Sequence, residues 1–164
     1  MLYLLCVVGN DRFGIEANRV VEVLPLLHWK HVPKAQYGIV GLLNYHGTPV
    51  PVVDLSLLML GTLAPRRMHT RIVLVRTYPD PASQEPTLLA LVAERVRGSF
   101  RRSEEEFTAP DAAVLTAPYL GPVVSDEKEI LQRLDVDRIV PLEARLHDPQ
   151  MTQMHRIEVE GSTS

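Results

Sequence analysis

The chain of 164 residues contains one cysteine, Cys6, which excludes a disulfide bond within the chain. A sequence of this kind suits a reducing compartment, and we expect the protein to be cytoplasmic. The apolar start, residues 1–8, is too short to span a membrane and has no basic segment before it. We therefore expect a buried strand there, with neither a signal peptide nor direct membrane insertion.

Aromatic residues and excess positive charge are also scarce. Phe, Trp and Tyr make up 5% of the chain, and the formal net charge is -3. Nucleic acids are usually bound by a basic face, and single strands also need aromatic stacking platforms. The composition therefore argues against a nucleic-acid partner, whereas 46% hydrophobic residues are enough to build a core.

Motifs of catalytic and cofactor sites are missing. The sequence has no Gly-x-Ser-x-Gly elbow and no Gly-Lys-Ser/Thr phosphate loop. His28, His31 and His46 come nearest to a metal-binding set. However, the segment around the first two contains Pro33, has no helical period and has no carboxylate nearby in sequence. We expect no enzymatic activity, no metal and no cofactor.

What the sequence does contain is a series of short apolar segments separated by turn-forming residues, which predicts an all-β fold. Many of these segments are rich in β-branched residues, which suit a pleated sheet. Strands are expected at 2–8, 13–15, 20–24, 39–44, 49–53, 70–76, 87–93, 96–100, 119–124 and 129–134, and short helices at 55–60 and 135–140.

The stretch 41–60 is expected to form a strand, a tight turn, a second strand and the start of a helix. Asn44 and Gly47 bracket the expected turn, because both residue types tolerate a positive φ. Pro49 and Pro51 lie two residues apart, so one edge of the second strand lacks N–H donors. This pattern predicts an edge strand or a bulge.

Two aspartates occupy corresponding positions in the two halves of the chain. Asp54 and Asp135 each follow a predicted strand and are placed to cap a short apolar helix. The order of short strands in 13–20 also resembles that in 91–96. This repetition predicts a duplicated small barrel. The alternative is that short strands with Asp caps recur by chance.

Three motifs occur in the order found in a known family. Phe13-Gly14-Ile15-Glu16, followed by Val20-Val21-Glu22-Val23, is similar to Y-G-I-D…V-x-E-I. Residues 41–47 are similar to G-V-x-N-L-R-G, and residues 51–55 to P-V-V-D-L. The ordered set resembles the CheW-like domain, the adaptor of bacterial chemosensory signalling.

The resemblance covers residues 1–142 and implies two side-by-side SH3-like five-stranded β barrels with short connecting helices. The first barrel is expected at about 12–65 and the second at about 69–140, with exchange of the terminal strands as an alternative. Residues 143–164 are expected to form a partly disordered C-terminal extension.

The resemblance also implies a non-enzymatic adaptor between the cytoplasmic tip of a chemoreceptor and a CheA-type histidine kinase. The groove between the barrels would receive the receptor. The receptor-facing positions would be Val20, Gly41 and His46, with Glu22 and Asn44 nearby. A glycine at 41 would allow the backbone of a partner to approach closely. Self-association in membrane receptor arrays is compatible with this role.

The sequence departs from the family pattern at several positions. His46 stands where the family usually has Arg, Tyr45 replaces Leu, and 79–86 lengthens a hairpin loop. His offers fewer donors than the fixed fork of Arg and titrates near neutral pH. We therefore expect a divergent coupling protein with its own receptor and kinase. The alternative is a small barrel module that binds a ligand or single-stranded nucleic acid.

Overall fold

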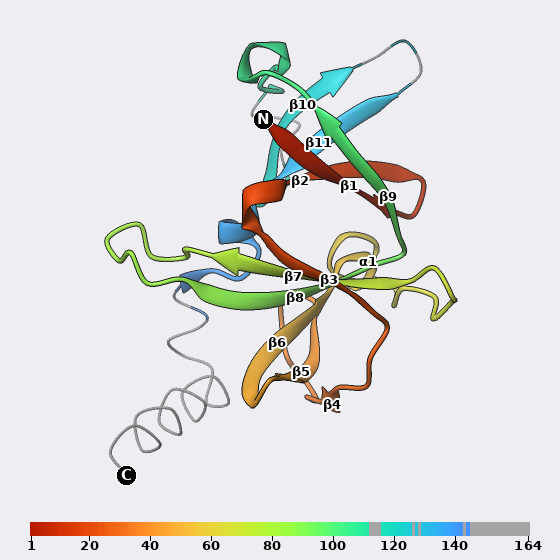
Figure 1. Ribbon diagram of the computed structural model, residues 1–164, viewed down its shortest axis with the longest axis vertical. Coiled ribbons are helices and arrows are strands. Elements are labelled where there is room, and N and C mark those ends of the chain that lie inside the picture. Colours follow the sequence, from red (N-terminus) through yellow and green to blue (C-terminus); the bar gives the residue numbers. More distant parts are fainter. Residues whose placement is uncertain (112–115, 126, 128, 143, 145–164) are drawn as a thin grey trace.

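The computed structural model describes residues 1–111, 116–125, 127, 129–142 and 144. Two antiparallel-rich sheets lie one above the other (Figure 1). The first has the order β10-β11-β2-β1-β9 and contains β1 (Leu2–Val8), β2 (Asp11–Glu16), β9 (Arg95–Arg101), β10 (Leu120–Ser125) and β11 (Ile130–Leu134). The second has the order β3-β7-β8-β6-β5-β4 and contains β3 (Val20–Pro25), β4 (Lys30–His31), β5 (Ile39–Tyr45), β6 (Thr48–Asp54), β7 (Arg71–Thr77) and β8 (Thr87–Ala93).

In the described part of the chain, four short helical segments follow strands. One is the α-helix α1 (Leu55–Leu60), and three are 3₁₀ turns: η1 (Ala17–Arg19), η2 (Glu104–Glu106) and η3 (Val136–Arg138). The second predicted helix, 135–140, is therefore shorter than expected and 3₁₀ in geometry. The all-β prediction of two SH3-like barrels is confirmed. Residues 126 and 128, between the predicted strands 119–124 and 129–134, and most of 143–164 lie outside the described residues.

The two sheets have the same internal plan. Read from one edge, β3-β7-β8-β6-β5 corresponds to β9-β1-β2-β11-β10. In each sheet the third and fourth strands of this order form a parallel pair, β8 with β6 and β2 with β11. The fourth strand is then followed by a short Asp-capped helix, α1 in one case and η3 in the other. This correspondence supports the predicted duplication.

The sheets do not divide the chain at residues 65–69. Strands β1 and β2 stand at the start of the sequence but complete the sheet formed by β9, β10 and β11. The expected barrels at 12–65 and 69–140 therefore do not coincide with the sheets, since 20–93 supplies all of the second sheet. The alternation of apolar and polar residues along a strand indicates which face of the strand is buried. It does not indicate which other strand lies beside it.

A continuous apolar layer lies between the two sheets. It includes Cys6, Val8 and Ile15 from the first sheet and Val73 and Leu91 from the second, all at most 1% exposed. A separate apolar cluster fills the interior of the second barrel. The two barrels therefore share the apolar layer between them, and the second barrel also has a core of its own.

Strand β6 lies inside its sheet, so the expected edge position is wrong for its second half. Its residues Val52–Asp54 pair in parallel with β8. Pro49 and Pro51 precede that pairing and lie opposite β5. The missing N–H groups thus fall where only one neighbour is present, which explains how the strand accommodates two prolines.

Candidate functional site

The hairpin between β5 and β6 ends in a two-residue turn at the surface. His46 and Gly47 occupy its centre with φ of 50° and 88°, between the paired residues Tyr45 and Thr48. Positive φ at both central residues is the geometry that matches the twist of a tight hairpin. His46 is exposed at the tip.

Asn44 contributes to this turn differently from the expectation. Its backbone belongs to β5, and it is not among the residues with positive φ. Its side-chain Oδ1 instead accepts a 2.8 Å hydrogen bond from the N–H of Gly47. Asn44 therefore stabilises the turn from outside, and the positive φ that was expected there falls on His46.

Tyr45 joins the hairpin to the edge strand β3. Its hydroxyl donates a 2.7 Å hydrogen bond to Oε2 of Glu22, which raises the pKa of the Tyr45 phenol. The rings of Tyr45 and His46 lie 4.5 Å apart, nearly perpendicular. Glu22, Asn44, Tyr45 and His46 thus form one polar surface, which we call the hairpin-tip surface. The sequence showed Tyr45 as a departure from the family pattern but not as a site residue.

Gly41 is covered by another segment of the chain, residues 29–31, and does not lie at the surface. It is buried, and β4 pairs with it through His31. A Cβ added at this position would overlap the carbonyl oxygen of Lys30 and the indole of Trp29. The close approach that we expected from a partner is therefore made by residues 29–31, and Gly41 supports the site from below.

Strand β3 carries apolar side chains to the surface. It is an edge strand, and Val20 and Val23 lie opposite Val75 and Val73, which belong to the core between the sheets. Val23 is 40% exposed, and the neighbouring Val21 is 38% exposed. At Val20 and Val23, β3 therefore continues the core between the sheets toward solvent. Val20, Val21 and Val23 together are the β3 apolar strip.

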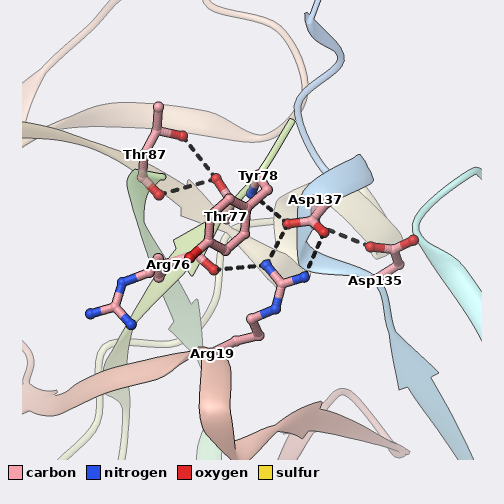
Figure 2. Close-up of polar contacts among 7 residues, drawn as sticks. All are labelled: Arg19, Arg76, Thr77, Tyr78, Thr87, Asp135 and Asp137. Carbon is pink, nitrogen blue, oxygen red and sulfur yellow. Dashed lines mark hydrogen bonds and ion pairs between the residues drawn. The ribbon is translucent and has the colours of Figure 1, made fainter. Parts of the chain in front are cut away.

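A polar network lies where the chain crosses from the first sheet to the second (Figure 2). Arg19, in η1, donates from both terminal nitrogens to the two carboxylate oxygens of Asp137, each at 2.9 Å. Asp137 also accepts the N–H of Tyr78 at 2.6 Å, and the Arg19 guanidinium lies 4.8 Å from the centre of the Tyr78 ring. The network ties η1, η3 and the end of β7 together.

The two aspartates that cap helices have different surroundings. Asp54 is 3% exposed and accepts the N–H groups of Leu57 and Ala64 at 3.1 and 2.9 Å. Asp135 accepts the N–H of Asp137 at 3.1 Å and is half-buried. Burial raises the pKa of the Asp135 carboxyl, and this effect outweighs the stabilisation of its charge by that hydrogen bond.

A cavity of 270 Å³ lies beside the network. Its lining comes from β2, η1, β10, β11 and η3, with Glu16, Arg19, Gly121, Pro122, Arg133, Leu134, Asp135, Val136 and Asp137. Both arginines in it are already paired, Arg19 with Asp137 and Arg133 with Glu104. The cavity therefore presents mixed charge, which does not select a ligand of one sign.

Residues with metal-binding or nucleophilic chemistry are dispersed. Among the described residues, no three His, Cys, Asp or Glu side chains lie close enough together to hold a metal ion. Cys6 is fully buried, and burial raises the pKa of its thiol to about 12. Over the same part of the chain, no helix is long and apolar enough to cross a membrane.

Two SH3-like barrels with one plan and a shared core, together with a surface site on an edge strand and a hairpin tip, define a double-barrel β protein. The model of the CheW-like domain matches residues 2–144, so the chain belongs to the CheW-like domain family.

Solved structures include a related fold. The crystal structure of the scaffolding protein TtCheW from Thermoanaerobacter tengcongensis is similar, with a TM-score of 0.70 and 16% identity. The match covers 87% of this chain and 89% of that chain. Among curated proteins, none matches significantly. At this level of identity, the structural likeness establishes the fold.

Proposed function

We propose that this protein is a non-enzymatic cytoplasmic adaptor that couples a chemoreceptor to a CheA-type histidine kinase in a chemosensory pathway. Membership of the CheW-like domain family supports this role. The observation that carries the proposal is the β3 apolar strip, where the core between the barrels reaches the surface on an edge strand. Apolar side chains that are exposed beside polar ones are typical of protein interfaces.

The receptor contacts the β3 apolar strip and the hairpin-tip surface. Val20, Glu22, Asn44 and His46 remain receptor-facing, and Tyr45 joins them because it binds Glu22. Gly41 has a supporting role, since an added side chain would displace residues 29–31. Hydrophobic contact along β3 supplies affinity, and the polar hairpin tip discriminates between receptors.

An adaptor that binds two partners at once needs a second surface, and the loop after α1 suits the kinase. Leu60, Leu63 and Met68 are 51%, 65% and 95% exposed, which makes them prominent among the exposed apolar residues. Arg66 and Arg67 lie between them, and the sequence contains no carboxylate from residue 55 to 79. This loop therefore suits a partner surface that combines apolar and acidic groups.

The test is calorimetric titration of the purified protein with the regulatory domain of the CheA-type kinase from the same organism, and separately with a helical-hairpin fragment of a chemoreceptor. We expect micromolar or tighter binding to both, with a negative heat-capacity change from apolar burial. Absence of binding to either partner by the folded protein would contradict the adaptor role. Binding to single-stranded oligonucleotides that weakens steeply with salt would favour a barrel module for nucleic acid instead.

A further inference from the structure

The chain crosses between the two sheets at two places, and each crossing is held by a polar side chain that follows a capping aspartate. One crossing is η1, between β2 and β3, and the other is Glu94, between β8 and β9. Asp137 binds the first crossing through Arg19, and Ser56 donates a 2.9 Å hydrogen bond from its hydroxyl to Glu94 at the second. Asp137 and Ser56 each lie two positions after a capping aspartate, Asp135 and Asp54 respectively. They therefore occupy corresponding places in the two halves of the chain.

The two side-chain contacts that hold the crossings differ in chemistry. Ser56 is 1% exposed and makes one hydrogen bond to Glu94. The side chains of Arg19 and Asp137 are each 24% exposed and form a pair with two parallel hydrogen bonds. A bidentate pair of this kind fixes orientation as well as distance, because the guanidinium is a planar fork.

The Arg19–Asp137 pair reaches elements of both sheets. Arg19 also donates to the carbonyl oxygen of Arg76 at 3.3 Å, and Asp137 accepts the N–H of Tyr78. Figure 2 shows the Tyr78 ring beside the guanidinium, between the pair and the end of β7. Because η3 follows β11 in the first sheet and β7 belongs to the second, the pair sets the position of η1 against both.

Strand β3 begins directly after Arg19. As an edge strand it is paired with β7 on one side, and its register with β7 shifts between Val20 and Glu22. The backbone of β3 is therefore paired on one edge only, with an irregularity at its start, while Tyr45 holds the side chain of Glu22. Because Arg19 immediately precedes Val20, its contacts with Asp137 help to set the position of Val20 and Glu22 relative to the first sheet.

We propose that Arg19 and Asp137 are positioning residues for receptor binding: the pair holds the start of β3 in the place from which Val20 and Glu22 meet the receptor. This inference rests on the proposed function. Since both side chains are 24% exposed, water replaces part of the lost interaction, and loss of the pair should lower the stability of the fold modestly. Its loss should therefore change the geometry of β3 more than the stability of the fold.

The experiment compares Arg19→Lys, which keeps the charge but loses the fork, with Asp137→Asn and the double variant. Arg12→Lys is the matched control, because Arg12 forms a 2.6 Å ion pair with Glu129, with side chains 29% and 33% exposed, away from the crossings. Each single variant should weaken binding of the receptor hairpin fragment about three- to thirtyfold, and the double variant no further. Kinase binding should stay unchanged, the Tm should fall only slightly, and receptor binding by the control should stay unchanged.

Hydrogen exchange of the β3 amides provides a readout that does not depend on any partner. Arg19→Lys and Asp137→Asn should speed exchange at residues 20–24 of β3 and leave β1 protected, whereas Arg12→Lys should change neither. Unchanged exchange at β3, or receptor and kinase affinity falling together with the Tm, would overturn the positioning role. If the unmodified protein binds no receptor while β3 exchange responds as expected, the proposed function fails and the positioning of β3 stands.

Discussion

The Tyr45 hydroxyl donates to the Glu22 carboxylate at 2.7 Å, across 23 residues of sequence. This bond joins the tip of the β5–β6 hairpin to the edge strand β3. It brings a phenol, a carboxylate and the exposed His46 ring into one small surface.

The first prediction concerns the titration of Tyr45. The hydrogen bond favours the neutral phenol and the nearby carboxylate disfavours the phenolate, so the pKa of Tyr45 lies above its ordinary value. Glu22→Gln should lower that pKa toward the ordinary value, as followed by the NMR signals of the Tyr45 ring during a pH titration. Tyr119, whose pKa is raised by burial, serves as the internal control and should not move. An unchanged Tyr45 titration in the variant would show that the bond does not persist in solution.

The second prediction concerns His46. His46→Arg should broaden the range of receptor fragments that the protein binds, because Arg grips a carboxylate with a fixed fork. The variant should fold normally, since His46 is exposed at the hairpin tip. The measurement is binding to a panel of receptor fragments by pull-down or two-hybrid assay, with His46→Ala as the control for simple loss of the ring. A panel that does not change would refute the role of His46 in receptor choice.

The third prediction concerns Gly41. Gly41→Ala should lower the free energy of unfolding by about 1–3 kcal/mol, because the new methyl group overlaps Lys30 and Trp29 and must displace them. Gly47→Ala is the comparison: nothing lies near its added methyl group, so its cost is conformational, about 1 kcal/mol. Urea denaturation gives both values. If Gly41→Ala proves neutral, residues 29–31 do not pack on Gly41 in solution.

The fourth prediction concerns the pH dependence contributed by Asp135. Its folded pKa is raised above the unfolded value, mainly by burial, so its contribution to stability is complete at low pH and is lost as the pH rises through the folded pKa. Asp135→Asn keeps a hydrogen-bond acceptor at the cap but removes the charge. The Tm of this variant minus that of the unmodified protein should therefore increase as the pH rises from acid to neutral. Parallel Tm curves for Asp135→Asn and the unmodified protein would contradict the prediction.

The fifth prediction concerns the loop after α1. Leu63→Ser combined with Met68→Ser should weaken kinase binding while leaving the Tm and receptor binding unchanged, because both side chains are largely exposed. Calorimetry with the kinase regulatory domain measures the effect. Ile130→Ser is a matched control, since Ile130 is 66% exposed at the start of β11 in the other barrel. Kinase affinity that falls only in the control would move the kinase surface to the first sheet.

Local order along the chain follows from the sequence alone. Short segments of β-branched residues coincide with the strands, because their pattern reports burial on a pleated sheet. The end of β6 and the start of α1 could likewise be placed, because a side chain that caps a helix acts within one turn of its own position. The order of three family motifs was enough to indicate the fold.

Tertiary structure alone decided which strands share a sheet and which residues meet at the site. Backbone pairing groups are the same in every strand, so nothing local to β1 or β2 assigns them to the sheet of β9. The same holds for Gly41, where the nearest atoms belong to residues 29 and 30 and not to a partner. Arg19 and Asp137 lie 118 residues apart. They meet because β2 and β11 pair in parallel, which brings the following segments, η1 and η3, to the same end of the sheet.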